Sequence, residues 1–541
     1  MTRRSSIRLL AQTAVLAGLS ARKALSQSVF DVVVYGGTAA GVVAAVAAAR
    51  QGARVALIEP GSHLGGMVSS GLGATDTGNP AVIGGLCLEF FQTVGKAYGT
   101  PVQYNFPPSV AEAAFQTLVA SAGVNVFLGQ ALAETNGVAV NGTTITSITL
   151  ADGSVFPAAV FVDATYEGGL MSQSGVTCAY GRESSRQYCE WLGGVQAGTR
   201  VNGSFALDPY DASGNLLPEI SSAPRGIPGQ WDQRVQAYTF RLCATMDPAN
   251  LVPFPQPPGY DAGRYELALR YLQALPGATF ENAIAGVVAL PDGKFDINGG
   301  YFFSTDYVGG SAAYPTASSL QRSSIWQAHY QYQAGLLYFI ASDSRVPAAV
   351  QQGVNAYGLA ADEFTDSDNW PPLLYVREAR RMLGSYVLTQ SDMTAHPAKP
   401  DSIGMGSYPF DSHSCQRVLG ANNGTLMVQI EGEFNPKPPT QLFQIPYRAI
   451  LPVPSQISNL LVPVCCSASH VGFCAIRLEP QYMVMGEAAG TAAAIASLSR
   501  TPPAQLNVAA LQAVLSGNGA VLSLPGASEE RGSVCRDFVP T

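Results

Sequence analysis

The chain has 541 residues, which is enough for two or three domains around a large core. Only 13% of the residues are charged and the formal net charge is −8, so the composition does not indicate the basic surface that nucleic-acid binding needs. The 56 glycines and 36 prolines recur without a period, which is typical of a loop-rich globular protein.

Residues 1–26 have the pattern of an export signal. The pair Arg3-Arg4 precedes a modest apolar run at Leu9–Leu19, and small residues up to Ser26 mark a cleavage point. The run is too short to span a bilayer. The paired arginines resemble a twin-arginine signal, and a secretory-pathway signal is the alternative. We expect an exported protein, periplasmic or secreted, with no membrane span.

Residues 31–60 are predicted to form a strand, a tight turn, a helix and a second strand. The β-branched run Val32–Tyr35 suits a buried parallel strand, and an Ala-rich segment of helical character follows the turn. The second strand, Arg54–Ile58, is followed by an acidic residue, Glu59. This is the order of elements found in dinucleotide-binding units.

The turn itself is rich in glycine. Gly36 and Gly37 would allow a tight turn, and Gly41 would let the helix pack closely, with its N-terminus facing a pyrophosphate. Thr38 stands where the middle glycine is usual, although its hydroxyl could donate to a phosphate. Glu59 could accept hydrogen bonds from ribose hydroxyls. The pattern favours a dinucleotide site, and an ordinary strand–helix–strand unit is the alternative.

The next segments are predicted to complete the first part of a nucleotide domain, residues 27–180. A helix at 109–123 and a strand at 124–128 come first. The turn dipeptides at 141–142 and 152–153 separate alternating strands, which predicts a small β-meander. The apolar strand that ends at Asp163 would return the chain to the central sheet.

Residues 181–455 are predicted to form a mixed α+β substrate or capping region. Aromatic-rich loops dominate it, with helices near 314–342 and 371–384. Helix-spaced aromatic residues are usually core, whereas the loop residues 301–303 (Tyr-Phe-Phe) could stack on a sugar ring. Residues 456–541 would then return to the nucleotide domain, with a strand at 457–466 and a helix at 485–500.

Cysteine and histidine spacing does not indicate a metal site. Nine cysteines cannot all pair within one chain, so at least one thiol is free or bonded elsewhere. Cys465 and Cys466 are adjacent, there is no C-x-x-C spacing, and His413 has no ligand partner at metal spacing. We expect no metal.

Seven segments together resemble the FAD-dependent oxidoreductase family of two-dinucleotide-binding-domain flavoproteins, whose members are often labelled FAD-dependent oxidoreductase or xanthan lyase. The resemblance implies an α/β fold: a Rossmann-like FAD-binding domain with an inserted β-meander and a mixed α+β substrate or capping region. It covers nearly the whole mature chain. The segments are YGGTAAG (35–41), HLGGMVSSGLGATD (63–76), FVDATYEG (161–168), LYVREARRMLG (374–384), SYPFDSH (407–413), IPYRAILP (445–452) and SASHVGFCAIRLEPQYMVMGEAAGTAAA (467–494).

The resemblance implies FAD as the cofactor. It places a Gly-Gly turn beside the flavin and the N-terminus of the final helix, around Gly486 to Ala489, at the flavin pyrimidine edge, where the helix dipole would stabilise the reduced anion. His63, just before the Gly-Gly turn, is a less favoured candidate for covalent attachment. The expected cofactor-binding residues are Gly36, Gly37, Thr38, Gly41, Glu59, Gly65, Gly66, Met67, Asp163, Gly486 and Ala489.

His413 and His470 are the candidate catalytic bases, because neutral imidazole titrates near working pH. The alternative for each is a hydrogen-bonded buried histidine. Arg448 and Arg477 lie in the segments closest to the C-terminal strand, and either could compensate flavin or substrate charge.

A cluster of arginines lies at 377–381. Glu378 and Arg381 are three residues apart and would share a face of the predicted helix, so an internal salt-bridge network is favoured there. The alternative is an arginine that anchors a substrate carboxylate.

Three functions are consistent with these patterns. The favoured one is an exported FAD enzyme that oxidises a small polar, sugar-related substrate by hydride transfer. A second glycine-rich fingerprint is absent, so oxygen, a quinone or another external acceptor would reoxidise the flavin. The alternatives are a flavin-dependent reductase fed by an external donor, and a carbohydrate-binding or lyase-like protein with a structural flavin.

Overall fold

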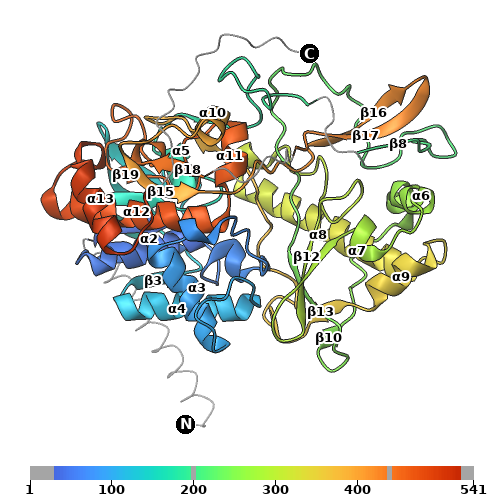
Figure 1. The fold of residues 1–541 in the computed structure, drawn as a ribbon, viewed down its shortest axis with the longest axis horizontal. Coiled ribbons are helices and arrows are strands. Elements are labelled where there is room, and N and C mark those ends of the chain that lie inside the picture. The colour runs from blue at the N-terminus through green and yellow to red at the C-terminus, as the bar shows by residue number, and fades with distance from the viewer. Residues whose placement is uncertain (1–29, 197–202, 435–441, 525–541) are drawn as a thin grey trace, which may run out of the picture.

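A computed structural model describes residues 30–196, 203–434 and 442–524. The predicted export signal, residues 1–26, lies outside the described residues. The described part forms two lobes (Figure 1): early and late segments of the chain make up one, and segments from the middle make up the other. None of the helices in the described ranges combines the length and the apolar character needed to cross a membrane.

The first lobe is built on a seven-stranded sheet, ordered β3-β2-β1-β6-β5-β4, with β19 beside β6. The parallel strands are β1 (Phe30–Tyr35), β2 (Val55–Glu59), β3 (Asn125–Leu128), β19 (Leu460–Leu461) and the later part of β6 (Val155–Asp163). Val32, Val33 and Val34 are all fully buried. A continuous apolar run is expected where both faces of a parallel strand are covered, and the α/β class is confirmed.

The predicted β-meander is confirmed. β4 (Val138–Asn141) pairs antiparallel with β5 (Thr144–Thr149), which pairs with the first part of β6. Gly142 and Gly153 have φ angles of 61° and 84°, in the left-handed region that the two turns require. Because β6 pairs with β5 and then with β1, one strand joins the meander to the central sheet.

Four helices cover this sheet: α2 (Ala39–Arg50), α3 (Gly85–Ala97), α4 (Pro108–Ala122) and α12 (Glu479–Ser499). α12 lies close against α2, because a Cβ on Gly486 or Gly490 would come 2.4 or 2.0 Å from the carbonyl oxygens of Ala40 and Ala44. The predicted start of this helix was wrong. It begins at Glu479, so Gly486 and Ala489 lie in its middle and not at its N-terminus.

The second lobe contains a five-stranded antiparallel sheet, ordered β10-β13-β9-β12-β11. Its strands are β9 (Leu242–Thr245), β10 (Leu251–Val252), β11 (Gly286–Ala289), β12 (Lys294–Asn298) and β13 (Gly358–Ala360). Its helices are α6 (Glu266–Ala274), α7 (Phe280–Ala283), α8 (Ser319–Ser342) and α9 (Ala348–Asn355). A capping box formed by Ser318 and Gln321 sets the start of α8, within the predicted range 314–342.

The remaining helices and strands are short. They are α5 (Gly169–Gln173), β7 (Cys178–Ala179), β8 (Ser204–Phe205), β14 (Arg381–Met382), α10 (Gln390–Thr394), β15 (Ser402–Gly406), β16 (Gln416–Asn422), β17 (Thr425–Glu431), β18 (Phe443–Pro446), α11 (His470–Ile476) and α13 (Val508–Gly517). The helix predicted at 371–384 was wrong, since this segment is extended and contains only β14. The strand predicted at 457–466 is reduced to β19.

Replacing Gly490 by alanine tests the α2–α12 contact. The added Cβ would meet the Ala44 carbonyl at 2.0 Å, so one helix must shift, at a cost of roughly 1–3 kcal/mol. We expect a lower thermal unfolding midpoint. Gly517→Ala in α13 is the matched control, because its Cβ would meet no atom within 4 Å. Equal midpoints for the two variants would contradict this packing.

Candidate functional site

The glycine-rich turn after β1 leaves no room for a side chain at Gly36 or Gly41. Gly36 has a φ of 102°, and a Cβ on it would lie 2.8 Å from the Ala164 backbone. A Cβ on Gly41 would lie 1.8 Å from the Gly36 carbonyl oxygen. The first turn of α2 therefore sits directly at the carboxyl ends of β1 and β6. Helix N–H groups in a first turn have no intrahelical acceptor, so they are available to a phosphate.

Thr38 is the N-cap of α2. Its Oγ1 accepts a hydrogen bond from the Gly41 N–H at 3.2 Å and donates to the Ala164 carbonyl oxygen at 2.7 Å. The hydroxyl proton is thus directed at the neighbouring strand, and the suggested donation to a phosphate has no support in this geometry. Thr38 instead fixes the position of the helix N-terminus relative to β6.

Glu59 braces the same turn from the end of β2. Its Oε2 accepts from the Gly37 N–H and its Oε1 from the Gly61 N–H, both at 2.6 Å. Burial raises the pKa of the Glu59 carboxyl to about 7, although the two N–H donors oppose the rise. A carboxyl group in this place is where dinucleotide-binding folds contact the ribose.

The Gly65-Gly66 turn adjoins the first turn directly. The Gly65 N–H donates to the Gly37 carbonyl oxygen at 2.7 Å. Both glycines have positive φ angles, and their Cβ atoms would meet the Phe115 ring at 2.4 Å and the Tyr166 hydroxyl at 2.5 Å. The two glycine turns therefore form one bare stretch of backbone at the carboxyl edge of the parallel strands, which fits the pyrophosphate and ring of an FAD.

A buried hydrogen-bond chain supports the second turn. The Met67 N–H donates to the Tyr166 hydroxyl at 2.9 Å, and that hydroxyl donates to Glu479 Oε1 at 2.6 Å. Glu479 opens α12, and its second oxygen is buried without a hydrogen-bond partner in the described part of the chain. Burial raises the pKa of Glu479 to about 8, so the side chain is largely neutral near pH 7.

Three other expected cofactor residues make contacts that support the fold. Asp163 is buried; its Oδ1 accepts from the N–H and hydroxyl of Thr165, and its Oδ2 accepts from the Met171 N–H at 2.7 Å. It holds the turn that leads from β6 into α5. Gly486 and Ala489 are buried in α12, where Gly486 meets α2, so neither lies at a helix end that could face a flavin.

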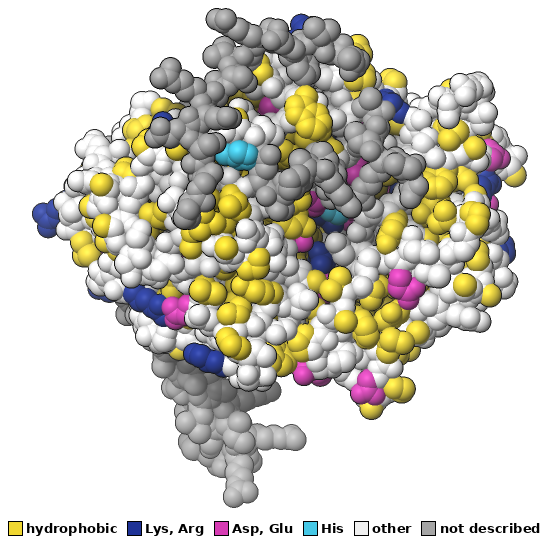
Figure 2. All heavy atoms as spheres, in the orientation of Figure 1, with side chains coloured by type: hydrophobic (Ala, Val, Ile, Leu, Met, Phe, Trp, Pro, Cys, Tyr) yellow, Lys and Arg dark blue, Asp and Glu magenta, His cyan; other side chains and the backbone are white. Residues whose placement is uncertain are grey.

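A polar cavity of about 300 Å³ contains two of the predicted catalytic or substrate residues, His413 and Arg477. Its wall comes from segments far apart in the sequence. The other lining residues are Asp76, Arg241, Gly286, Asn298, Gly299, Gly300, Tyr301, Tyr375, Tyr408 and Asp411. Figure 2 shows a hollow on one face in which charged side chains and a histidine gather amid largely uncharged surface.

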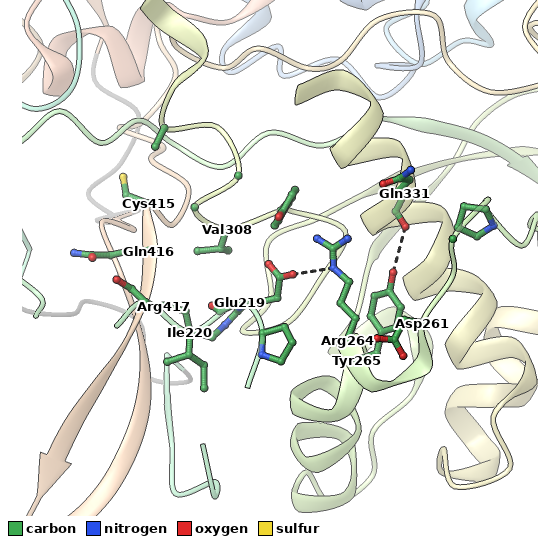
Figure 3. A pocket seen from close by; sticks show the side chains of 18 of the residues that line it. Glu219, Ile220, Asp261, Arg264, Tyr265, Val308, Gln331, Cys415, Gln416 and Arg417 are labelled. Atoms are coloured by element: carbon green, nitrogen blue, oxygen red, sulfur yellow. Dashed lines mark hydrogen bonds and ion pairs between the residues drawn. The ribbon is translucent and has the colours of Figure 1, made fainter. Parts of the chain in front are cut away.

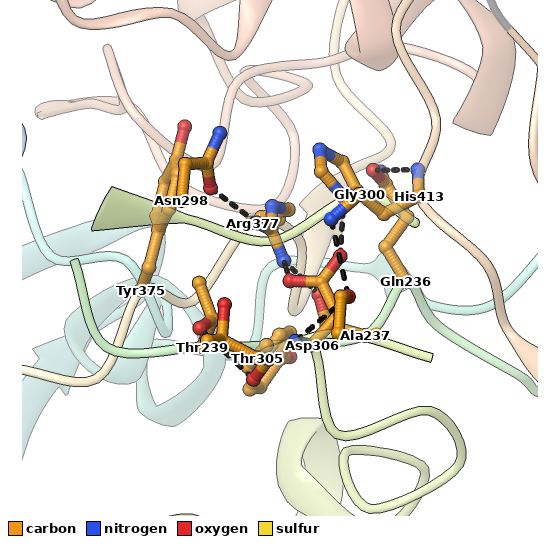
Figure 4. Close-up of polar contacts among 12 residues, drawn as sticks. Gln236, Ala237, Thr239, Asn298, Gly300, Thr305, Asp306, Tyr375, Arg377 and His413 are labelled. Carbon is orange, nitrogen blue, oxygen red and sulfur yellow. Dashed lines mark hydrogen bonds and ion pairs between the residues drawn. The ribbon is translucent and has the colours of Figure 1, made fainter. Parts of the chain in front are cut away.

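His413 is held by a buried carboxylate (Figure 4). Its Nδ1 lies 2.6 Å from Asp306 Oδ2, and Asp306 Oδ1 lies 2.9 Å from the Arg377 guanidinium. Burial alone would raise the pKa of Asp306, but Arg377 and His413 lower it to about 2. An ionised Asp306 accepts from Nδ1–H, and this leaves Nε2 as the nitrogen able to accept a proton. Nε2 lies 3.6 Å from Asp411 Oδ2.

The remaining charged groups around the cavity occur in pairs. The Arg477 guanidinium contacts Asp411 Oδ2 at 3.0 Å and the Tyr375 hydroxyl at 3.2 Å. Arg241 forms a two-point ion pair with Asp296. Burial would raise the pKa of Asp411, but His413 and Arg477 lower it below its usual value.

A tyrosine partners the last of the lining carboxyls. The Tyr408 hydroxyl donates to Asp76 Oδ1 at 2.9 Å. Burial raises the pKa of Asp76. Sequence reasoning missed Asp76, Asp306 and Tyr408, although the first and last lie within segments that carry the family resemblance.

His470 lies outside the residues that line this cavity. It is 1% exposed, and its Nδ1 contacts both oxygens of Glu378 at 2.9 and 3.0 Å. The Nε2 of His470 is buried and has no hydrogen-bond partner among the described residues. Gln236 joins the two histidines. Its side-chain amide nitrogen donates to the Glu378 carboxylate at 3.0 Å, and its side-chain oxygen accepts from the His413 backbone N–H at 3.1 Å.

Of the three arginines at 377–381, Arg377 and Arg381 belong to buried ion pairs, whereas Arg380 donates to the Glu167 main-chain carbonyl oxygen at 3.1 Å. Arg381 contacts Glu378, as expected from their spacing, and lies 2.7 Å from Glu183. The pair forms although the segment is not helical. Arg377 holds Asp306, so neither guanidinium faces the cavity as an unpaired anchor for a carboxylate.

Two further residues are placed away from the cavity. Arg448 is 46% exposed and forms a two-point ion pair with Asp401, which gives its predicted substrate role no support. Both ring nitrogens of His63 contact carboxylates, Glu112 at 3.1 Å and Asp366 at 3.0 Å. This arrangement leaves no nitrogen of His63 directed at a flavin.

The raised pKa values predict how stability changes with pH. A group whose pKa is higher in the folded state stabilises the fold below its unfolded value and loses this contribution as pH rises. Glu479, whose pKa is about 8 in the folded state, loses this stabilising contribution as the pH rises to about 8. Glu59 and Glu487, whose pKa values are about 7, lose theirs as the pH rises to about 7. We expect the unfolding midpoint to fall between pH 5 and 8, and less steeply in Glu479→Gln.

Glu89→Gln is the control for this measurement. Glu89 pairs with Arg50 on the surface, and this partner lowers its pKa, so it does not titrate between pH 5 and 8. Thermal scans at several pH values give the slopes. The same slope in Glu479→Gln and in the wild type would contradict a neutral, buried Glu479.

Comparison with known proteins agrees with this reading. The chain matches the family described as FAD dependent oxidoreductase over residues 31–515. No curated protein matches it in sequence.

Several solved flavoprotein structures are similar to parts of the chain. THI4 of Thermovibrio ammonificans is 21% identical over 34% of this chain and 75% of its own, with a TM-score of 0.24. The amino acid oxidase NikD is 16% identical over 29% and 57%, with a TM-score of 0.22. Thioredoxin reductase of Streptococcus pyogenes is 18% identical over 28% and 36%, with a TM-score of 0.18. This chain therefore spans about half or less of the length of NikD and of the thioredoxin reductase. TM-scores this low carry no argument about activity.

The family match covers most of the sequence and contains both glycine turns, Glu59 and the polar cavity. The chain belongs to the FAD dependent oxidoreductase family, and FAD is its cofactor.

Proposed function

We propose that the protein oxidises a small polar, uncharged substrate, such as a sugar-related alcohol, by hydride transfer to FAD. Oxygen, a quinone or another external acceptor would then reoxidise the flavin. The observation that carries the proposal is the pair formed by His413 and the ionised Asp306 at the wall of a polar cavity.

FAD supplies the hydride acceptor when it is bound. The residues that would hold it are those of the two joined turns, Gly36–Gly41 and Gly65–Met67, together with Glu59 at the ribose. The N-terminus of α2 provides N–H groups for the pyrophosphate.

His413 would take the proton of the substrate hydroxyl. In the neutral ring, Asp306 fixes Nδ1 as the donor nitrogen, so Nε2, 3.6 Å from Asp411 Oδ2, would carry the lone pair. Arg377 keeps Asp306 ionised and in place from the side opposite to His413. A base positioned in this way typically contributes 10²–10⁴-fold to the rate.

The charges around the cavity favour a neutral substrate. Among the lining residues, Arg241 and Arg477 carry positive charge and Asp76 and Asp411 are acidic. Each arginine already contacts a carboxylate, so binding a substrate carboxylate would break an ion pair. Tyrosine hydroxyls and the Asn298 amide can instead exchange hydrogen bonds with substrate hydroxyls. A volume near 300 Å³ limits the bound part to about one sugar ring.

His413→Asn tests the base directly. We expect the rate of flavin reduction by substrate, measured anaerobically without NAD(P)H, to fall by about 10²–10⁴-fold. Asp306→Asn should lower kcat with little change in KM, because it affects the tautomer of His413 and not substrate contacts. Arg448→Gln is the control, since Arg448 lies in an exposed ion pair away from the cavity.

The same experiment separates the alternatives. Alcohols and sugars that bleach the flavin support the proposal, whereas turnover only with a reduced dye and an unsaturated acceptor would support a reductase. Eliminative cleavage that is unaffected by flavin reduction would support a lyase. Unchanged flavin reduction in His413→Asn would overturn the role of His413.

We also propose that the protein is exported, on the pattern of residues 1–26. N-terminal sequencing of the protein from cells fractionated into cytoplasm and periplasm tests this. A chain that starts near residue 27 outside the cytoplasm supports export, and an intact cytoplasmic chain contradicts it.

A further inference from the structure

A second, larger cavity of about 820 Å³ lies in the second lobe. It shares no lining residue with the polar cavity. Figure 3 shows side chains from several segments converging on it, among them Glu219, Arg264, Gln331 and Arg417. Its size is that of a site for a small molecule, and nothing in the proposed reaction uses it.

The inner wall carries more positive than negative charge. Arg264 donates from Nε to Glu219 Oε1 at 3.0 Å, and its side chain is 25% exposed. Arg417 is buried; it donates to the main-chain carbonyl oxygens of Glu219 and Phe302, and its Nε has no hydrogen-bond partner among the described residues. The Glu219 carboxylate contacts Arg264 and not Arg417, so Arg417 adds a positive charge that no carboxylate contact compensates in the described residues.

The other charged lining residues do not change this balance at the inner wall. Arg234 lies 3.3 Å from Asp232, which compensates it. Asp261 is exposed and accepts from the Gly263 N–H at 2.9 Å. An anionic group would therefore be attracted to the side formed by Arg264 and Arg417.

Aromatic surfaces form the rest of the wall. The Arg264 guanidinium lies 5.0 Å from the ring centroid of Tyr307, and Tyr260 and Tyr265 also line the cavity. Pro257 and Pro258 add an apolar edge. Flat aromatic faces next to a stacked guanidinium suit a ligand that contains a ring.

We propose that this cavity is a second ligand site, in which Arg264 and the tyrosine wall bind a small ring-bearing carboxylate and the buried Arg417 adds positive charge behind them. Two sources share this chemistry, an acidic sugar and an aromatic acid.

The site is linked to the catalytic base through the backbone. Tyr307, which lines this cavity, directly follows Asp306, and Cys415, which also lines it, lies two residues after His413. A ligand that moves either segment would change the His413–Asp306 contact. This coupling rests on the proposed function, whereas the binding itself does not.

Titration calorimetry on the holoenzyme tests binding, with D-glucuronate and 4-hydroxybenzoate as probes and methyl β-D-glucoside as the neutral comparison. We expect one of the two acids to bind, and we expect Arg264→Gln to leave any binding of the neutral glycoside, a substrate-like probe of the polar cavity, unchanged. Arg264→Gln should weaken acid binding at least tenfold, and Arg264→Lys should retain part of the affinity. The acid that binds identifies the source.

Arg270→Gln is the matched control, because Arg270 is also 25% exposed, pairs with Glu266 and does not line the cavity. If Arg264→Gln fails to fold, Ser221→Asp adds a negative charge at the wall and should also weaken acid binding. The proposal is overturned if neither acid binds, if Arg264→Gln weakens binding of the neutral glycoside as much as that of the acid, or if neither folded variant loses affinity for the acid. Binding with no effect on kcat at saturation would overturn the coupling to His413.

Discussion

The structure depends on the absence of side chains where three elements meet: the end of β1, the first turn of α2 and the middle of α12. At Gly36, Gly41 and Gly486 a Cβ would come within 2.8 Å of backbone atoms of another segment. Only this close approach brings the N-terminus of α2 to the edge of the parallel strands. The same edge carries the Gly65-Gly66 turn, and we propose that the surface shared by the two turns is the cofactor site.

The second constraint is the set of buried charges behind the polar cavity. Asp306, Arg377, Glu378 and Arg381 are each at most 3% exposed, and each has a partner of opposite charge or an imidazole. Removing one partner of a buried pair typically costs 3–5 kcal/mol, because the other charge stays buried and uncompensated. These pairs position His413 and therefore restrict the site to one arrangement. Gln236 links the pairs into one network.

Much of the first lobe could be predicted because its signals are local. The β-meander follows from turn dipeptides, and the turn at Gly36 with Glu59 follows from a short motif. The family resemblance supplied the cofactor. The start of α12 was placed six residues late because Glu479 and Gln481 are polar, although both are buried in the structure.

The candidate site was predictable only in part. His413 and Arg477 were found, but Asp306 lies 107 residues from His413 in the sequence and no local pattern joins them. The Glu378–Arg381 pair was inferred from the helix predicted at 371–384, but it also forms in the non-helical chain, because the two side chains meet at the same buried site. Arg448 shared a recognisable segment with the family, yet its side chain points to Asp401 at the surface. Side-chain direction of this kind depends on tertiary contacts.

The visible absorption spectrum of the purified protein, repeated on the supernatant and pellet after acid denaturation, tests the central claim that the two glycine turns hold FAD. We expect flavin bands in the folded protein and their release into the supernatant, since no nitrogen of His63 is directed at a flavin. A folded protein that remains colourless after incubation with FAD would contradict the account.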